Sequence, residues 1–368
     1  MSLALRERLH AAFAPPRYLA FPFSGIDLSA SGVKAVRLSE GIRGLTLANY
    51  TETRLQPGAF TDGEIIDRPA VVEALKTAAK ATGITSANVA LPESKAYLFE
   101  TTAQGSRKVD WSVSVEQRLD ELVPLPPTET GFDIINVGHG ASGGDVPILG
   151  IGIAKRIVDN TLSVFDEAGI EVCAFEGEIF SMARALLPKG DTSTTLIIDV
   201  GKTTTKLAIV AERIPRFATT IGIGGHAFTL AIQKHFGVTE AEARKVKYEN
   251  GIVPAPGNED YLAAMLSTVS AIRDEISRRL EYWQSRASPT SAHEPVSQAI
   301  LSGGNASIRG LPEYLEGSLK IPVRTGDVFA NFASRDAWVP APDYTESLAY
   351  ATAIGLALRD DAVVTGYA

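Results

Sequence analysis

The chain has little cysteine, no long apolar run and no excess of positive charge. Its one cysteine, Cys173, excludes a disulfide within the chain, and its apolar, strand-like surroundings predict a buried core thiol rather than a nucleophile. No apolar run approaches the ~20 residues of a membrane-spanning helix, and the first residues lack a signal-peptide core followed by a cleavage site. A formal net charge of −8 argues against a nucleic-acid partner. These absences predict a cytoplasmic protein with no transmembrane segment.

The stretch LIIDVGKTTTKLAIV, residues 196–210, is the most informative part of what is present. Its apolar start predicts a buried strand, Asp199 ends that run, and Gly201 permits a sharp turn. Hydroxyl side chains follow before the sequence becomes apolar again. A hairpin of this kind can direct N–H groups and hydroxyls at a phosphate, while its carboxylate can hold a cation through water.

The stretch GIDLSASGVKAVRL, residues 25–38, has the same plan. Lys34 follows Asp27 by seven residues, as Lys206 follows Asp199. We interpret the repeat as an internal duplication, in which two lobes hold one phosphate chain from opposite sides. Two unrelated surface hairpins, each with an aspartate in its turn, are the alternative. A solvated strand residue that points outward is the favoured interpretation of both lysines, with direct phosphate contact as the alternative.

The rest of the chain predicts four parts. We expect a first lobe at 20–94, 171–192 and 340–368, an inserted subdomain at 95–170, a second lobe at 193–224 and 296–339, and a helical subdomain at 225–295. Apolar periodicity and helix-end residues predict helices over 68–82, 112–122, 155–168, 177–187, 227–236, 239–249, 261–286, 311–319 and 346–358, and a strand over 298–302. Residues 1–13 predict a frayed terminal helix. An amphipathic helix that rests on a membrane or partner is the alternative.

Two glycine-rich turns point to a ligand. The turn at 222–225 leads into the helix over 227–236, and a turn of this kind at a helix N-terminus predicts an anion site. Gly303 and Gly304 follow the strand over 298–302 and remove side chains where a planar ligand would approach.

Three motifs in fixed order carry a family resemblance. GIDLSASGVK, IIDVGKTTTK and ILSGGNASIRGLPEYL resemble the two phosphate loops and the adenosine loop of the actin/Hsp70/sugar-kinase superfamily. Within it the chain is similar, from about residue 24 to 360, to the PilM family of actin-like type IV pilus assembly proteins, and more distantly to FtsA. NVALPESKAYLFETTA, VPLPP and FEGEIFSMARALL support this. The resemblance implies an α/β fold of duplicated actin-like ATPase (ribonuclease H-like) lobes with an inserted α+β subdomain.

The resemblance also implies an ATP site with Mg²⁺ between the lobes. Asp27 and Asp199 match the two acidic positions that face the magnesium. The phosphate positions are matched by Ser29, Ser31 and Lys34 in the first phosphate loop and by Gly201, Lys202, Thr203 and Thr204 in the second. Gly224 and Gly225 match the glycines near the ribose and phosphate. The adenosine positions are matched by Glu242 and Lys245, on a Glu-x-x-Lys helix, and by Gly303, Gly304 and Asn305 in the adenine loop. Glu178 aligns with the region from which some relatives position attacking water. From the residues alone, a helix-start carboxylate is the favoured interpretation of Glu178, and an exposed helix pair is the alternative for Glu242 and Lys245.

The function implied is a cytoplasmic ATP-binding scaffold of a type IV pilus or related secretion machine, peripheral to the inner membrane. It would dock the cytoplasmic tail of a PilN-like inner-membrane partner and could self-associate. Many relatives carry small residues at the positions of Lys202 and the three threonines that follow it. The resemblance therefore leaves undecided whether the chain hydrolyses ATP slowly or only binds it. An FtsA-like division protein and a small-molecule kinase of the sugar-kinase branch are the alternatives. Against them, the acidic tail RDDAVVTGYA has no basic amphipathic face, and the first lobe shows no cluster of polar residues for a sugar.

Overall fold

The computed structural model describes residues 23–41, 44–105, 107–138, 145–286 and 294–359. The helix predicted over 1–13 and residues 360–368 of the acidic tail lie outside these ranges. Within them, no helix combines the length and the apolar character that crossing a bilayer requires.

Two five-stranded sheets share one strand plan, which confirms the predicted duplication. In each sheet a three-strand antiparallel meander is followed by two strands parallel to its first strand. The first sheet has the order β3–β2–β1–β6–β10 and the second the order β13–β12–β11–β14–β15. The strands are β1 Ser24–Ser29, β2 Gly32–Gly41, β3 Gly44–Arg54, β6 Ser86–Leu91 and β10 Glu171–Gly177 in the first sheet, and β11 Thr195–Val200, β12 Thr205–Ala211, β13 Ile214–Ile221, β14 Gln298–Ser302 and β15 Val323–Thr325 in the second. A short hairpin, β4 Phe60–Thr61 and β5 Glu64–Ile65, follows the first meander.

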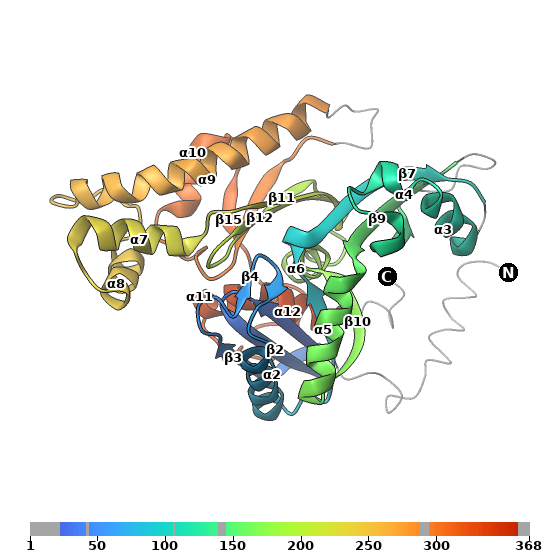
Figure 1. Cartoon of the computed structure of the whole chain (residues 1–368). Coiled ribbons are helices and arrows are strands. Elements are labelled where there is room, and N and C mark those ends of the chain that lie inside the picture. Colours follow the sequence, from blue (N-terminus) through green and yellow to red (C-terminus); the bar gives the residue numbers. More distant parts are fainter. Residues whose placement is uncertain (1–22, 42–43, 106, 139–144, 287–293, 360–368) are drawn as a thin grey trace.

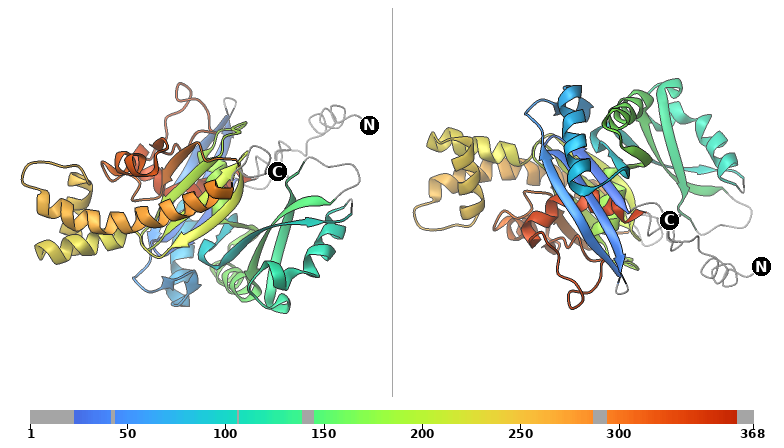
Figure 2. Two further views of the ribbon diagram at one scale, coloured as in Figure 1. Left: turned by 90° about the horizontal axis from the view of Figure 1, so that it is seen from above. Right: turned by 90° about the horizontal axis from the view of Figure 1, so that it is seen from below.

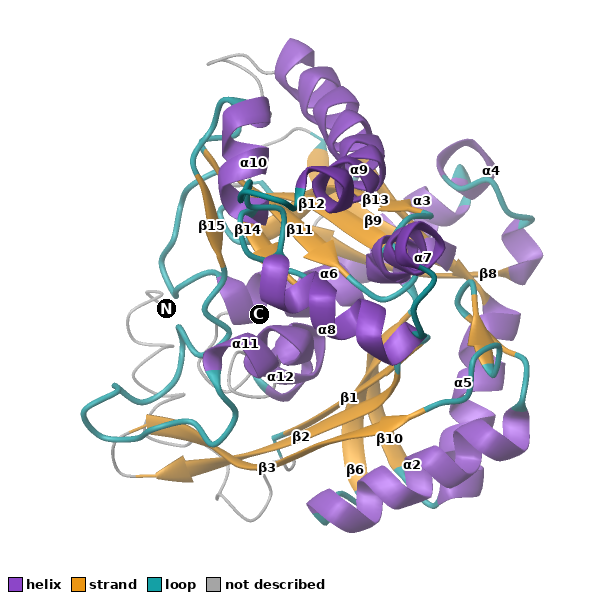
Figure 3. Ribbon diagram, turned by 90° about the vertical axis from the view of Figure 1, so that its left-hand side faces the viewer, coloured by secondary structure: helices purple, strands orange, loops and turns teal. Residues whose placement is uncertain are grey.

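Helices cover both faces of each sheet, and this explains why the central strands β1 and β11 are buried along almost their whole length. Helices α6 Glu178–Leu186 and α12 Ala351–Ala357 lie between the two sheets (Figure 3). Their side chains join strand residues of both lobes in one core, which includes Val36, Ile197 and Ile300. The two lobes are therefore packed on a shared pair of helices.

The outer faces are covered by separate sets of helices. Helices α2 Arg68–Thr82 and α5 Lys155–Ala168 pack on the first sheet. The second sheet carries α7 Gly225–Phe236, α9 Glu259–Arg286 and α10 Leu311–Leu319, with α8 Glu240–Asn250 packed beside α7. Figures 1 and 2 place α7 and α8 on the side of the molecule opposite the inserted subdomain.

The inserted subdomain is a three-stranded antiparallel sheet with its own core. Strands β7 Ala96–Ala103, β9 Val146–Ala154 and β8 Thr130–Asn136 lie in that order, and α3 Lys108–Glu116 and α4 Leu119–Leu122 cover them. Short 3₁₀ turns, η2 Glu93–Lys95 and η3 Pro127–Glu129, connect the elements. Helix α5 was expected in this subdomain, but Val164 and Phe165 of α5 belong to the first-lobe core.

Three expectations about local structure are wrong. The single helix predicted over 112–122 is two helices, α3 and α4. The helix predicted over 346–358 is divided into α11 Tyr344–Ser347, the 3₁₀ turn η4 Leu348–Tyr350 and α12. Cys173 is half-buried, not in the core, because it lies at an irregularity in the pairing of the edge strand β10.

Helices α6 and α12 approach each other backbone to backbone. A Cβ added at Gly355 of α12 would lie 1.8 Å from the carbonyl oxygen of Ser181 in α6. Only glycine fits at such a distance. The glycine at position 355 therefore allows close packing of the two helices between the lobes.

Candidate functional site

The two hairpins carry the same cross-strand pair of charges. Lys34 lies opposite Asp27 in the β1–β2 register, and Lys206 lies opposite Asp199 in the β11–β12 register. Cross-strand neighbours project from the same face of a sheet. The Lys34 Nζ atom is accordingly 4.0 Å from Asp27 Oδ2, and the Lys206 Nζ atom is 3.8 Å from Asp199 Oδ2. Each buried carboxylate thus has its own ammonium.

The expectation that these lysines point outward into solvent is wrong. Lys34 is only 7% exposed, and its Nζ donates to Ser31 Oγ at 2.7 Å. Lys206 lines a hollow between the lobes. The other described residues that line this hollow are Asp27, Ser29, Ala30, Ser31, Asp199, Gly201, Lys202, Thr203, Thr204, Gly303, Ala349, Ala351 and Thr352. The structure therefore brings both predicted phosphate loops and both aspartates to one place.

Glu178 joins this group from the first turn of α6. Its Oε1 accepts a hydrogen bond from Lys206 Nζ at 2.8 Å, and its Oε2 accepts one from the backbone N–H of Glu93 at 2.9 Å. Glu178 is a carboxylate at a helix start, as favoured from the residues alone, and it is also ion-paired across the lobes. Burial lowers the pKa of Lys206, but Glu178, Asp199 and Asp27 outweigh it, so the pKa lies above its ordinary value.

Burial is the largest cause of the pKa shifts of the acidic side chains in this region. It raises the pKa of Asp27 to about 6, against the lowering effect of Lys34. It also raises the pKa of Asp199, which Lys206 opposes. Burial, together with the charge of Glu178, raises the pKa of Glu93 to about 8. Lysines are needed here because several carboxylates share a dry site.

These side chains fit a magnesium ion poorly. Asp27 Oδ1 is buried without a hydrogen-bond partner, as a metal-facing oxygen would be. Asp199 and Glu178, however, both lie against the Lys206 ammonium, which a directly bound cation would have to displace. Among the described residues, no group of three or more His, Cys, Asp or Glu side chains is arranged to hold a metal. Asp199 and Glu178 are therefore held as lysine partners, not as direct metal ligands.

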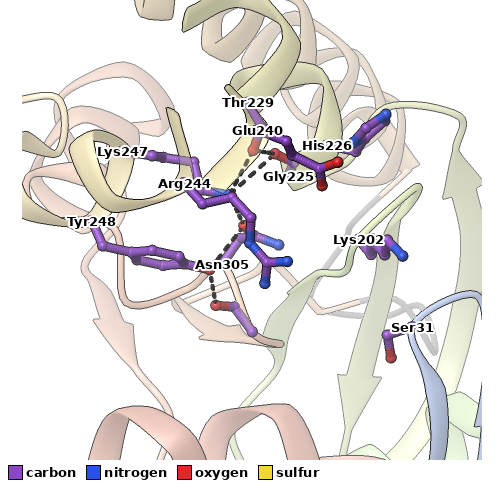
Figure 4. A pocket seen from close by; sticks show the side chains of 11 residues that line it. Ser31, Lys202, Gly225, His226, Thr229, Glu240, Arg244, Lys247, Tyr248 and Asn305 are labelled. Atoms are coloured by element: carbon purple, nitrogen blue, oxygen red, sulfur yellow. Dashed lines mark hydrogen bonds between the residues drawn. The ribbon is translucent and has the colours of Figure 1, made fainter. Parts of the chain in front are cut away.

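A second hollow lies next to the first and is lined in part by α8; Figure 4 shows the residues that line it. Ser31 and Lys202 line both hollows, so the two adjoin, and we call them together the cleft. The remaining residues of the second hollow are Gly225, His226, Thr229, Glu240, Arg244, Lys247, Tyr248, Gly304 and Asn305. In Figure 4, Lys202 and Ser31 lie across open space from Arg244. One end of the cleft thus carries hydroxyls, two lysines and two aspartates, and the other an aromatic ring and a guanidinium.

Asn305 connects the loops of the cleft. Its Nδ2 donates to the Gly201 carbonyl at 2.8 Å, and its Oδ1 accepts from Lys247 Nζ at 2.9 Å and from the Tyr248 hydroxyl at 3.3 Å. Burial lowers the pKa of Lys247 to about 8. The predicted adenine-loop residue Asn305 is therefore a connector between the second phosphate loop and α8.

The first N–H groups of α7 do not form the predicted anion site, because they donate to carbonyls of the second phosphate loop. The N–H of Gly225 donates to the Gly201 carbonyl at 2.9 Å, and that of His226 donates to the Lys202 carbonyl at 2.8 Å. A Cβ at Gly224 would lie 2.6 Å from Thr204 N. Gly224 lets α7 pack on the second phosphate loop, whereas Gly225 makes room for the Asn305 side chain, and of the two only Gly225 lines the cleft.

The adenine-loop glycines have different tasks. Gly303 has φ +88°, and a Cβ there would lie 2.7 Å from the Val200 carbonyl oxygen, so its glycine is required by the backbone. A Cβ at Gly304 would meet its nearest atom only at 3.8 Å. Gly304 leaves space in the cleft, and its carbonyl oxygen accepts a hydrogen bond from the Tyr248 hydroxyl at 2.9 Å.

The structure does not bring Glu242 and Lys245 to the cleft. Glu242 accepts the Thr239 N–H in a capping box at the start of α8, and the Lys245 side chain is 74% exposed beside Glu249. The face of α8 that lines the cleft carries Glu240, Arg244, Lys247 and Tyr248, which sequence reasoning missed. The Thr-x-x-Glu spacing at 239–242 was the available signal, because it assigns Glu242 to the helix start.

Comparisons with known proteins agree with this architecture. A family model described as type IV pilus assembly protein PilM matches residues 25–361. A solved PilM-PilN type IV pilus biogenesis complex contains a chain with 20% identity and a TM-score of 0.77, covering 92% of this chain and 98% of that one. MreB5 of Spiroplasma citri bound to ADP has 15% identity and a TM-score of 0.55, covering 94% and 98%. The ethanolamine utilization protein EutJ from Carboxydothermus hydrogenoformans has 14% identity and a TM-score of 0.51, covering 97% and 99%. These structures share the duplicated actin-like fold.

Proposed function

The chain belongs to the PilM family of type IV pilus assembly proteins, and on this premise we propose that it binds an adenine nucleotide and docks an inner-membrane partner. The nucleotide would occupy the cleft between the lobes. The partner would present its cytoplasmic tail to the first lobe and the inserted subdomain. The family match favours this function over an FtsA-like division protein and over a small-molecule kinase.

The continuity of the cleft is the observation that carries the nucleotide proposal. Ser31 and Lys202 belong to both hollows, so one elongated ligand can reach both ends. The lysine-rich end suits a phosphate chain, which needs N–H, O–H and ammonium donors. The other end offers the Tyr248 ring, the Arg244 guanidinium and the open space at Gly304, which suit a planar base. Crystals of MreB5 of Spiroplasma citri, which has the same fold, hold ADP.

The position of Glu178 supports binding more than hydrolysis. A carboxylate that positions an attacking water must be free to turn an oxygen toward that water. Both oxygens of Glu178 already accept hydrogen bonds, from Lys206 and from the Glu93 N–H. We propose that the bound nucleotide stabilises one arrangement of the lobes, and that turnover is slow.

A fluorescent ATP analogue titrated into the purified full-length chain tests the nucleotide proposal. We expect saturable binding that unlabelled ATP competes away and that raises the melting temperature. Absence of both signals, with and without added Mg²⁺, would overturn it.

The partner proposal depends on open sheet edges near the inserted subdomain. Among the described strands, β10 ends the first sheet, and β7 and β8 are the edges of the inserted sheet. An extended peptide can add to such an edge as a further strand. The PilM-PilN complex is the structural neighbour with the TM-score of 0.77, which supports a PilN-like partner at the cytoplasmic face of the inner membrane.

A synthetic peptide of the partner tail, carrying a photo-crosslinker, tests the docking proposal. We expect the peptide to be retained by the immobilised chain and to crosslink to β10 or to the inserted subdomain. A scrambled peptide of the same composition is the control. No retention with or without ATP, or crosslinks confined to α7–α9, would contradict the proposed docking.

A further inference from the structure

The carboxylates at the phosphate end of the cleft converge on an ammonium from the chain itself. Lys206 Nζ lies 2.8 Å from Glu178 Oε1 and 3.8 Å from Asp199 Oδ2. These two acids come from different lobes, Glu178 from α6 and Asp199 from β11. Convergence of acids from separate elements is the arrangement in which a bound divalent cation would be expected, and here the lysine is placed among them.

The opposite hairpin repeats the arrangement. Lys34 Nζ lies 4.0 Å from Asp27 Oδ2 and donates to Ser31 Oγ, and Ser31 lines both hollows. Two ammonium groups therefore lie among the buried carboxylates of Asp27, Asp199 and Glu178, and Lys34 Nζ also lies 3.8 Å from Oε1 of the partly exposed Glu52. A divalent ion close to Lys206 would be repelled by it, and the repulsion is strong where water is scarce.

We propose that the Lys206 ammonium takes the place of the divalent cation in this cleft, so that the site binds a nucleoside triphosphate free of magnesium. This inference rests on the proposed nucleotide function. Lys206 lines the hollow and can reach a phosphate oxygen. Lys202 adds a second positive charge at the point where the two hollows meet. Glu178 and Asp199 then orient the Lys206 ammonium, and a phosphate oxygen of the nucleotide accepts its remaining hydrogen bond.

The test is the magnesium dependence of ATP affinity. The wild-type chain is titrated with a fluorescent ATP analogue in excess MgCl₂ and in excess EDTA. The inference expects the two dissociation constants to agree within about threefold. A loss of more than tenfold in EDTA would overturn it and leave the nucleotide proposal intact, whereas no binding in either buffer would overturn the nucleotide proposal itself. This measurement needs no variant.

Substitution of Lys206 is the second part of the test. Lys206→Met removes the charge and keeps most of the side-chain length, so affinity in EDTA should fall at least tenfold and Mg²⁺ should restore part of it. Lys206→Arg keeps the charge and should remain insensitive to Mg²⁺. Lys245→Met on the solvent face of α8 is the matched control and should behave as wild type. If Lys206→Met folds and is as insensitive to Mg²⁺ as the wild type, the inference is wrong.

Discussion

Lys206 of the second lobe and Glu178 of the first form an ion pair between the lobes, with Nζ 2.8 Å from Oε1. Both side chains are mostly buried. The pair belongs to the cleft and also to the packing of the lobes on α6. Any change at either residue therefore has two effects, one on ligand affinity and one on the contact between the lobes.

Glu178→Gln should weaken that contact. The amide retains the size of the side chain and an acceptor for the Glu93 N–H, but it leaves Asp199 as the remaining ion-pair partner of Lys206. Removing one partner of a buried pair costs about 3–5 kcal/mol, and we expect a loss of about 2–3 kcal/mol here because Asp199 remains. Urea unfolding measures it. An unchanged free energy of unfolding would show that the ion pair contributes nothing.

Arg244→Ala and Lys245→Ala separate the two faces of α8. Arg244 lines the cleft and Lys245 is exposed on the other side. We expect ATP affinity to fall about tenfold for Arg244→Ala, equivalent to about 1.4 kcal/mol, and to stay unchanged for Lys245→Ala. The opposite result would restore the Glu-x-x-Lys assignment made from the sequence.

Gly225→Ala should displace Asn305. The added Cβ would lie 2.0 Å from Asn305 Oδ1, so Asn305 must give up its bonds to Gly201 and Lys247. Overpacking of this kind costs about 1–3 kcal/mol, and ATP affinity should fall with it. Gly222→Ala is the control, because no heavy atom lies within 4 Å of the point that a Cβ would occupy there. Equal stability of the two variants, measured by thermal unfolding, would refute the packing role of Gly225.

Gly355→Ala should be the most damaging small substitution. Its Cβ would overlap the Ser181 carbonyl oxygen at 1.8 Å, and backbone atoms in a packed helix pair cannot move aside. We expect a loss of more than about 3 kcal/mol, at the upper end of overpacking effects. Gly317→Ala in α10 has open space and should instead stabilise by about 0.5–1 kcal/mol. Soluble expression and urea unfolding of the two proteins compare them directly.

Glu93 should make stability fall as pH rises. Its pKa is raised from 4.5 to about 8 in the folded chain, so the folded state keeps a proton that the unfolded state loses above pH 4.5. The free energy of unfolding should therefore decrease between pH 4.5 and 8, by up to about 4 kcal/mol from this group. Glu178 and Lys206 act on Glu93 from α6 and β12 and set the size of the effect.

Glu93→Gln is the variant that isolates this contribution. It should be more stable than the wild type at pH 8 and should show a shallower decline between pH 5 and 8. Asp27 and Asp199 also have raised pKa values, so some slope will remain. A variant that follows the wild-type profile would show that Glu93 is ionised in the folded state.

The sequence predicted well those elements whose ends carry local signals. Helix α2 begins after Asp67, whose side chain accepts the Ala70 N–H, and ends at Gly83 in the left-handed region; its predicted range of 68–82 is correct. The predicted ranges of α5, α10 and β14 are also correct. Such ends depend on neighbouring residues only.

The cleft could be predicted only in part, because its contacts join distant segments. The seven-residue spacing between Asp27 and Lys34 already implied opposite positions in a hairpin, and this signal was missed. The bond between Lys206 and Glu178, in contrast, needs both lobes in place. The helix expected over 346–358 is interrupted at η4, where the Leu348 carbonyl accepts the Gly303 N–H and the Ser302 hydroxyl. A tertiary contact of this kind leaves no trace in apolar periodicity.

Helix α12 covers one face of the first sheet and packs on β1 and β6. Strand β1, residues 24–29, is therefore synthesised long before the helix that covers it, residues 351–357. At about 5–20 residues per second, the ribosome takes on the order of 20–60 seconds to make the intervening chain. Throughout that time the part of the first sheet that α12 covers stays exposed in the nascent chain. Exposed apolar surface of this kind favours aggregation during translation.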